Sequence, residues 1–274
     1  HGIGSWLDIV CLLKPFHRKK IVANTHGGFF HTQQRRVLKL VYSRIFLPLI
    51  WKRIDCVIFD SESDQQHFSY LSLQRTRIVP NGIDVKRFTS LSPSKKRMTE
   101  LLFVGRVSLN KRVDRLLDAF FLVKEKNLSA HLHIVGEDWE ELLVGLQKRA
   151  KTMGLNENVS WHGKVSDEKL DKLYQRCGIF ASASEYEGFG ITAVESMAAG
   201  CIPCLNNIAP FRAFVEGDGE LITNFLNPPQ AANDLLHLID MPAPKVREKR
   251  KRIRALVNGF SLENIARKNL EIYF

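Results

Sequence analysis

The sequence lacks the features that mark membrane-spanning and disulfide-stabilised proteins. No apolar run approaches the roughly 20 residues that a spanning helix needs, and no secretory signal peptide is recognisable. The five cysteines are odd in number and lack the close, regular spacing of a disulfide framework, which is typical of a reducing compartment. Cys201 and Cys204 stand in a CxxC motif, but nothing nearby completes a zinc site, so we interpret both as buried thiols.

Metal-binding motifs are also missing. The chain has no Asp-x-Asp motif and no clustered histidines for a divalent ion, so we expect its chemistry to need no metal. Acidic residues are outnumbered, with 29 Asp and Glu against 40 Lys and Arg and a net charge of +11. This charge suggests nucleic acid, an anionic membrane face or a phosphorylated substrate as partner. We expect no nucleic acid, because exposed interleaved aromatics and a known reading motif are absent.

What the sequence does have is an alternation of short apolar runs with helical patterns. The helical patterns include 113–123 and 139–150. Because the apolar runs do not alternate with polar residues, they predict an α/β fold in which parallel sheets are covered by helices on both faces. The expected strands are 21–24, 56–59, 77–80, 101–104, 132–135, 159–161, 179–182 and 202–205.

A polar stretch at 84–99 separates two series of strands and predicts a domain boundary. We expect a partial domain at 1–92 and a complete α/β domain at 93–274, with the last helix packing back on the first domain. The first part supplies only about three strands and begins with His1 instead of Met, so we expect it to be truncated. The motif VPNGID at 79–84 predicts a tight turn between them, with Asn81 and Gly82 at positive φ.

The stretch SASEYEGFGITAVESMAAG, at 182–200, predicts a ligand site. It follows an expected strand and opens a helix, and ligands of parallel sheets bind where strands lead into helix N-termini. Free backbone amides and the helix dipole suit the turn at 188–192 to a phosphate, which Gly188 and Gly190 let approach closely. Glu195 can accept hydrogen bonds from a ribose diol, and Glu187 stands in the loop where a transferred group would lie.

A second loop, FVGRVSLNKRVDRLLDAF at 103–120, also follows a strand and opens a helix. Its Arg106 and Lys111 are expected to face the same cleft as the acids. Two cations there can neutralise the charge that develops on a departing diphosphate. We interpret the neighbouring Arg112 and Arg115 as ordinary surface charge.

These motifs, in this order, resemble the GT-B glycosyltransferases of family 4. The resemblance rests on the E-x7-E of Glu187 and Glu195, the "GR" with a lysine five residues after the arginine, VPNGID and HIVGE at 133–137, and it runs from about Ile21 to the C-terminus. It implies a retaining transferase that moves a sugar from a nucleotide donor between two Rossmann-like domains, with no cofactor. Members begin with a strand and a glycine-rich loop that this chain lacks.

The resemblance also implies roles for individual residues. Arg106 and Lys111 resemble the pair that binds the donor diphosphate, Glu195 the ribose ligand and Glu187 the acid beside the sugar. His26, in NTHGGFF, resembles a histidine placed against the donor sugar. The backbone that would meet the sugar and phosphates is at Gly188, Phe189, Gly190, Ile191 and Thr192.

The expected function is transfer of mannose from GDP-mannose to a lipid-linked or polysaccharide-precursor acceptor. The loop ASEYEGFG and the following NNIAPFRAFVEG resemble bacterial α-mannosyltransferases, which favours GDP-mannose over a UDP-sugar. A truncated remnant that binds nucleotide sugar without transferring it is the alternative. We expect a cytoplasmic protein.

Residues 32–53 interleave basic and large apolar side chains. One interpretation is a core-facing helix kinked near Pro48. The other is a helix on the inner face of the cytoplasmic membrane, with Phe46 and Trp51 inserted shallowly. In that second case the residues at the anionic headgroups would be Arg35, Arg36, Lys39 and Arg44.

Overall fold

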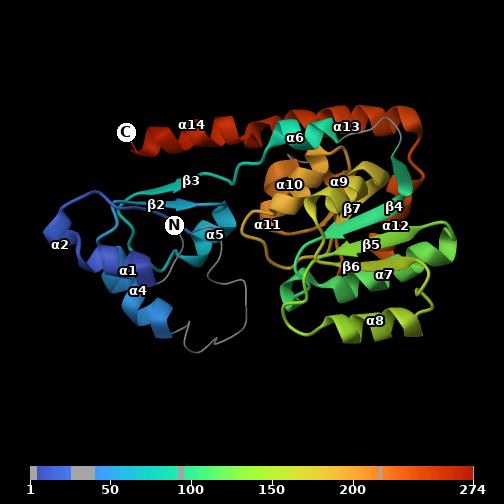
Figure 1. Cartoon of the computed structure of the whole chain (residues 1–274), viewed down its shortest axis with the longest axis horizontal. Helices are drawn as coiled ribbons and strands as arrows, with labels where there is room; N and C mark the ends of the chain where they lie inside the picture. The colour runs from blue at the N-terminus through green and yellow to red at the C-terminus, as the bar shows by residue number, and fades with distance from the viewer. Residues whose placement is uncertain (1–4, 26–40, 92–95, 216–217, 274) are drawn as a thin grey trace. The chain divides into compact units, whose positions relative to one another are not determined.

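A computed structural model describes residues 5–25, 41–91, 96–215 and 218–273. The chain forms two compact units (Figure 1). Unit 1 contains residues 1–82, 187–189 and 263–274, and unit 2 contains residues 83–186 and 190–262. The domain boundary after residue 92 stays a prediction.

Unit 1 is built on three parallel strands in the order β1-β2-β3. They are β1 (Val22–Asn24), β2 (Cys56–Phe59) and β3 (Thr76–Ile78). The helical segments among its described residues are α1 (Ser5–Leu12), α2 (Lys14–His17), the π-helix η1 (Tyr42–Phe46), α4 (Leu47–Trp51), α5 (Glu62–His67) and most of α14 (Leu262–Tyr273).

Both faces of the unit 1 sheet are covered by apolar side chains. On one face Val57 and Phe59 join a buried cluster with Trp51 and Phe68, whose rings stack with centroids 5.2 Å apart. On the other face Ile58 packs with Val79 and with Ile265 of α14. Burial on both faces explains why the central strand β2, Cys56–Phe59, is apolar throughout.

The buried Trp51 corrects one expectation about residues 32–53. Trp51 is 2% exposed and therefore does not insert into a membrane, although Phe46 is 52% exposed. Pro48 lies at the start of α4, directly after the π-helix, where a missing backbone N–H is tolerated. The guanidinium of Arg44 lies 5.1 Å from the ring centroid of Tyr70. The expected headgroup residues Arg35, Arg36 and Lys39 lie outside the described residues.

Unit 2 contains a parallel six-stranded sheet in the order β6-β5-β4-β7-β8-β9. The predicted strands are found, but β4 begins four residues earlier than predicted, and β9 is an additional two-residue strand. The bounds are β4 (Arg97–Val104), β5 (His131–Val135), β6 (Val159–Gly163), β7 (Cys177–Ser182), β8 (Ile202–Asn206) and β9 (Ile222–Thr223). Its buried strands include the thiols of Cys177 and Cys204. All five cysteines are free and buried, which confirms the prediction for Cys201 and Cys204.

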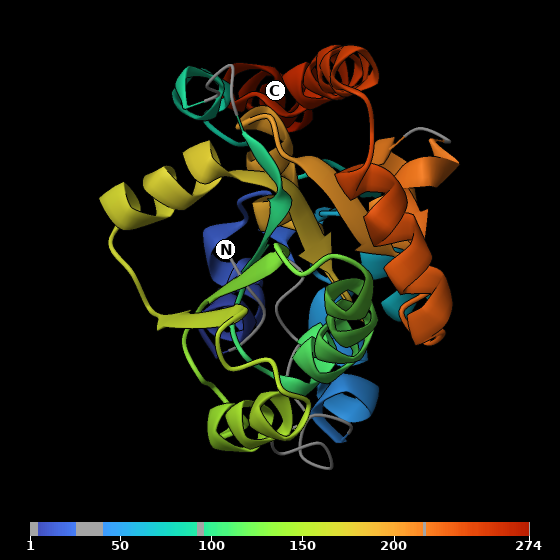
Figure 2. The same ribbon diagram turned by 90° about the vertical axis from the view of Figure 1, so that its right-hand side faces the viewer.

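Helices flank both faces of this sheet (Figures 1 and 2). On one side α7 packs against α8 and α12, and on the other α10 packs against α6 and α13. The stripe Val113, Leu116, Leu117, Phe120 and Val123 buries one side of α7, at the spacing that helix geometry requires. The bounds are α6 (Val85–Ser90), η2 (Leu109–Lys111), α7 (Val113–Lys126), α8 (Leu143–Thr152), α9 (Asp167–Arg176), α10 (Ile191–Ala198), α11 (Ala209–Val215), η3 (Gly219–Leu221), α12 (Pro228–Ile239), α13 (Ala243–Val257) and η4 (Asn258–Phe260).

The VPNGID segment is not the expected turn. Neither Asn81 nor Gly82 has positive φ. The Asn81 amide instead donates to a carboxylate oxygen of Asp60 at 2.7 Å. Asp84 caps α6 by accepting a hydrogen bond from the backbone N–H of Arg87 at 3.0 Å. The segment thus starts a helix through its last residue.

Within the described ranges, no helix is long and apolar enough to cross a membrane.

Candidate functional site

The strand order of unit 2 places two loops beside each other. From β4 the chain adds β5 and β6 on one side, then returns to add β7, β8 and β9 on the other. The adjacent strands β4 and β7 therefore form a topological switch point, beyond whose carboxyl ends ligands of open α/β sheets bind. The loop after β4 carries Arg106 and Lys111, and the loop after β7 leads to Glu195.

Arg106 is held by an aromatic side chain that the sequence did not single out. Its guanidinium carbon lies 4.2 Å from the ring centroid of Trp139. The backbone of Val107 joins the loop after β4 to the segment that carries Trp139. The Val107 N–H donates to the backbone carbonyl of Glu137 at 2.8 Å, and the Val107 carbonyl accepts from the backbone N–H of Trp139 at 3.1 Å. Trp139 was predicted to belong to a helix over 139–150, but α8 begins only at Leu143. Residue 139 instead forms a platform that orients a cation.

Two glycines bring the loops after β4 and β5 into close contact. Gly136 has φ of +148°, and a Cβ there would lie 1.7 Å from the carbonyl oxygen of Gly105. Position 136 therefore accepts only glycine without a shift of the loop that carries Arg106.

The loop after β7 enters α10 through another required glycine. Gly190 has φ of +99° and precedes the first helical residue. A Cβ there would lie 2.8 Å from the ring of Phe211, so the close approach at Gly190 is to a side chain of its own unit. Ile191 is exposed and Thr192 is half-buried in the first turn. Before this glycine, Glu187 and Phe189 are buried.

Glu195 lies one turn into α10 in a largely apolar environment. Burial raises the pKa of its carboxyl to about 7, against the opposing effects of a hydrogen bond from Tyr174 and the charge of Arg87. The Tyr174 hydroxyl donates to Oε2 of Glu195 at 3.3 Å. Asp167 and Asp171 raise the pKa further. Glu195 is thus a proton-exchanging group near neutral pH.

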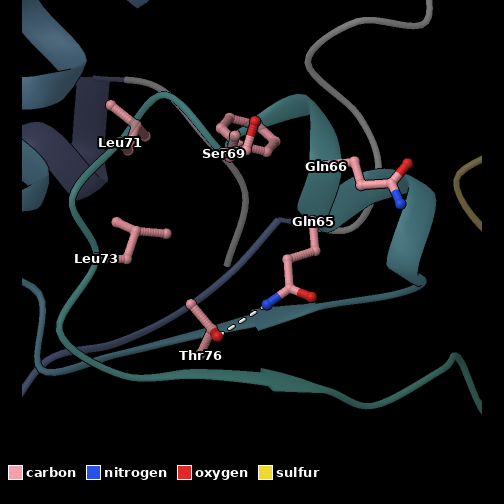
Figure 3. A pocket seen from close by; sticks show the side chains of 7 residues that line it. Gln65, Gln66, Ser69, Leu71, Leu73 and Thr76 are labelled. Atoms are coloured by element: carbon pink, nitrogen blue, oxygen red, sulfur yellow. Dashed lines mark hydrogen bonds between the residues drawn. The ribbon is translucent and has the colours of Figure 1, made fainter.

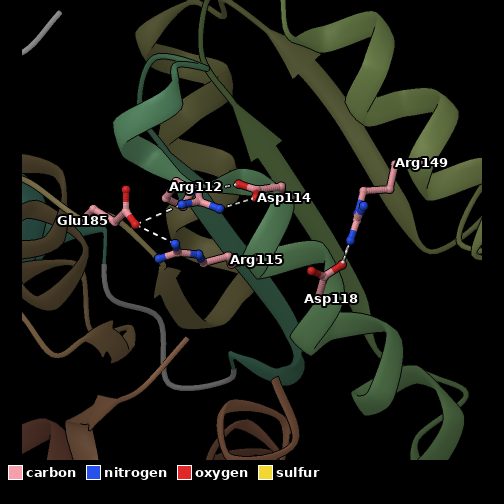
Figure 4. Close-up of polar contacts among 6 residues, drawn as sticks. All are labelled: Arg112, Asp114, Arg115, Asp118, Arg149 and Glu185. Atoms are coloured by element: carbon pink, nitrogen blue, oxygen red, sulfur yellow. Dashed lines mark hydrogen bonds and ion pairs between the residues drawn. The ribbon is translucent and has the colours of Figure 1, made fainter. Parts of the chain in front are cut away.

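Arg112 and Arg115 are not ordinary surface charge as predicted. Both reach the same oxygen, Oε1 of Glu185, at 2.9 and 2.6 Å. Arg112 also pairs with Asp114 through two hydrogen bonds of 3.0 and 2.7 Å (Figure 4). Their guanidinium groups tie the start of α7 to the loop after β7.

The backbone of Arg112 is unfavourable for this residue. Its φ of +49° is left-handed, which costs roughly 1 to 2 kcal/mol for a residue with a Cβ. The Glu185 and Asp114 side chains are 45% and 39% exposed, so the two ion pairs of Arg112 are screened and contribute only about 0 to 1 kcal/mol each. These opposing effects nearly cancel, and the gain in stability does not explain the arginine.

The carboxyl edge of the unit 1 sheet has a different chemistry. Asp60, directly after β2, is 2% exposed, and its Oδ1 has no hydrogen-bond partner among the described residues. Burial raises its pKa to about 6, which the bond from Asn81 opposes and nearby Asp64 reinforces. Thr25, after β1, donates its hydroxyl to Asp64. The sequence reading missed these groups, and His26, the residue after Thr25, lies outside the described residues.

A hollow of about 340 Å³ in unit 1 carries no such chemistry (Figure 3). It lies between α5 and the first residue of β3, where the Gln65 amide donates to the Thr76 hydroxyl at 2.8 Å. This is the amino end of the strand, the end opposite to the one where ligands of parallel sheets bind. The lining residues are Gln65, Gln66, Phe68, Ser69, Leu71, Leu73 and Thr76.

Curated relatives with named functions resemble this chain at moderate identity. The GDP-mannose:cellobiosyl-diphosphopolyprenol alpha-mannosyltransferase of Komagataeibacter xylinus is 31% identical over 82% of this chain and 57% of its own length. The enzyme of the same name from Xanthomonas oryzae is 31% identical over 89% of this chain and 64% of its own length. The chain therefore spans about three fifths of the length of these relatives.

Solved structures show the same fold. Anabaena HepE in complex with UDP superimposes with a TM-score of 0.81 at 18% identity, over 97% of this chain and 75% of that protein. TarM of S. aureus gives a TM-score of 0.73 at 21% identity, over 84% of this chain and 46% of TarM. The family model "Glycosyl transferases group 1" matches residues 84–255, well over half of the chain. The chain therefore belongs to the group 1 glycosyltransferase family and has its GT-B fold.

Proposed function

We propose that this chain binds a nucleotide sugar and transfers the sugar, with retention of configuration, to a lipid-linked saccharide. The observation that carries the proposal is the pairing of two loops at the β4/β7 switch point. One loop presents two cations, Arg106 and Lys111, and the other leads into α10, where Glu195 is largely buried.

Each part of the donor has a candidate partner. The two cations bind the diphosphate, and Glu195 accepts hydrogen bonds from the ribose diol. Glu187 and His26 are the candidate partners of the sugar. The backbone that would contact the sugar and phosphates is that of Gly188, Phe189, Gly190, Ile191 and Thr192.

The reaction exchanges one bond at the anomeric carbon. The bond to the diphosphate oxygen breaks, a bond to the acceptor hydroxyl forms, and the hydroxyl proton ends on the departing diphosphate. Negative charge grows on that diphosphate in the transition state, where Arg106 and Lys111 stabilise it more than in the ground state. These residues perform the role of a metal ion, so we expect transfer to continue in EDTA.

GDP-mannose is the proposed donor. The support is the name of the two relatives above, both GDP-mannose α-mannosyltransferases. Anabaena HepE was solved with UDP, so the fold alone does not select the base.

The test is a competition titration of the chain with GDP and UDP, followed by measurement of nucleoside diphosphate release from a panel of nucleotide sugars. We expect tighter binding of GDP and release only in the presence of a lipid-linked saccharide. Tighter binding of UDP would overturn the mannose donor. Failure of the folded chain to bind either nucleotide would contradict the proposed function, and binding without transfer would support a binding role alone.

We also propose that unit 1 contacts an anionic membrane surface. Its exposed side chains include Trp6 at 81%, Phe16 at 84% and Phe46 at 52%. The basic residues Lys19 and Lys20, which follow Phe16 in sequence, are also exposed. Aromatic groups insert at the interface while basic groups attract acidic headgroups. Sedimentation with anionic vesicles, reversed by salt, is expected. Equal binding to neutral vesicles would argue against this contact.

A further inference from the structure

The Glu185 cluster, which comprises Asn110, Arg112, Asp114, Arg115 and Glu185, lies at the switch point of unit 2. It was not part of the predicted site. Figure 4 shows Arg112 and Arg115 pointing to the Glu185 carboxylate, and Arg112 also facing Asp114. The arginines come from the junction of η2 with α7, and the glutamate comes from the loop between β7 and α10.

Backbone groups strengthen the same connection. The N–H of Glu185 donates to the carbonyl of Asn110 at 2.8 Å. The Asn110 amide donates to the carbonyl of Tyr186 at 3.2 Å, and its oxygen accepts from the Ser108 hydroxyl at 2.7 Å. The two loops are therefore joined by main-chain and side-chain contacts at consecutive positions.

The position of these contacts in the sequence matters for the donor. Asn110 and Arg112 flank Lys111, the proposed diphosphate ligand. Glu185 precedes Glu187, the proposed sugar ligand, by two residues. A joint between 110–115 and 185–186 thus restrains the two segments that would bind the two halves of the donor.

The unfavourable backbone of Arg112 supports a role beyond stability. A glycine would adopt φ of +49° freely, yet the chain has a residue whose long side chain reaches Glu185. Strained residues that persist near ligand-binding loops often serve to fix geometry. The screened ion pairs of Glu185 give little stability in return.

Resting on the proposed function, we propose that Arg112, Arg115 and Glu185 are positioning residues that set the β7–α10 loop relative to Lys111, so that the sugar and the diphosphate of the donor are bound together. None of the three needs to touch the donor. Their loss is expected to affect recognition of the sugar more than recognition of the nucleotide.

The test compares the affinities of GDP and GDP-mannose for the full chain by calorimetry. In Glu185→Gln we expect GDP-mannose affinity to fall at least fivefold while GDP affinity stays within twofold. Arg112→Gly should show the same split without a lower melting temperature, because glycine relieves the strained backbone. Asp118→Asn is the matched control, since Asp118 is another carboxylate paired with an arginine, Arg149, away from both loops.

The outcomes separate positioning from mere stabilisation. Equal loss of both affinities, or a split that also appears in Asp118→Asn, would show that the cluster only supports the fold. Unchanged affinity for GDP-mannose in both variants would overturn the proposal directly. If the parent chain binds GDP, but binds GDP-mannose no more tightly than a sugar phosphate that lacks GDP, the positioning proposal fails while nucleotide binding stands. If the parent binds neither nucleotide, the proposed function fails first.

Discussion

The two sheets of this chain share a parallel α/β architecture but present opposite chemistry at their carboxyl ends. The edge of the unit 2 sheet carries the cations Arg106 and Lys111, joined to further arginines at the start of α7. The edge of the unit 1 sheet carries the buried acid Asp60 beside Asp64, with Asn81 as its amide partner. One edge suits a polyanion, and the other holds two acids that are shielded from solvent.

This difference shows that the backbone supplies the place of a site while a few side chains decide its ligand. In both units the strand ends leave room for loops that lead into helices. The central strands β2 and β7 are buried along their whole length and say nothing about the ligand. The following predictions test the electrostatic contrast between the two edges.

The largest effect is expected from removing both cations of the unit 2 edge. Each charge-assisted contact to the diphosphate is worth roughly 1.5 to 3 kcal/mol, so Arg106→Ala with Lys111→Ala should weaken GDP binding by roughly 10²- to 10⁴-fold. Calorimetry with GDP measures this loss. Lys148→Ala with Lys151→Ala removes the same net charge from exposed positions on α8 and should change affinity little. A comparable loss of GDP affinity in that control would show that the effect comes from the overall charge of the chain and not from Arg106 and Lys111.

The unit 1 edge is expected to limit stability above pH 6. The pKa of Asp60 is raised from 3.8 to about 6 in the folded chain, so its contribution to stability is greatest below pH 3.8 and is lost as the pH rises through 6. Asp60→Asn removes the carboxyl whose ionisation is unfavourable in the folded chain. It should therefore stabilise the chain at pH 7.5 by roughly 2 to 3 kcal/mol. Thermal unfolding at pH 4 and pH 7.5 measures the difference.

Asp55 provides a control of opposite sign in the same unit. Burial raises its pKa, but hydrogen bonds from Lys14 and from the N–H of Ile21, at 2.6 and 2.7 Å, outweigh burial and lower the pKa below its ordinary value. Its stabilisation is present at neutral pH and is lost as the pH falls through the lowered pKa. Asp55→Asn should therefore lower the melting temperature at pH 7.5. Stabilisation by both substitutions would contradict the assignment of Asp60.

The smallest effect concerns the one acid of the unit 2 site whose pKa is near neutral. Only the carboxylate of Glu195 can accept both ribose hydroxyls, and the pKa of about 7 leaves it mostly protonated at pH 5.5. Affinity for GDP-mannose, whose phosphates do not titrate in this range, should rise roughly tenfold from pH 5.5 to 8, as one charge-assisted contact is gained. In Glu195→Gln the profile should be flat. A tenfold rise that persists in this variant would assign the titration elsewhere.

Much of the fold was predictable because strands buried on both faces carry an unmistakable pattern. All eight expected strands are found, and the helix predicted over 113–123 starts at the first residue of α7 and ends three residues before its last. The two-residue β9 was missed because it is too short to form a pattern. The helix predicted from Trp139 was placed four residues early because periodicity marks apolar spacing and not the contact that Trp139 makes with Arg106.

The site was less predictable because contacts between distant segments do not appear in local patterns. Motif spacing indicated Arg106, Lys111 and Glu195, whose roles stay predictions. Nothing local distinguished Arg112 from a solvated arginine, because its partner Glu185 is 73 residues away. Asp60 was not singled out because its burial depends on the packing of the whole unit. Sequence motifs therefore indicate candidate site residues, but the partners of their side chains are known only once the fold is known.

The contact between Gly136 and Gly105 limits how far the loop that carries Arg106 can move. With the backbone of residue 136 directly behind it, the loop that carries Arg106 cannot retreat toward β5. A loop that is already held in place loses little conformational freedom when a ligand arrives, so less of the binding energy is spent on ordering it. We therefore expect the entropy of donor binding to depend on Gly136, although this residue is not expected to contact the donor.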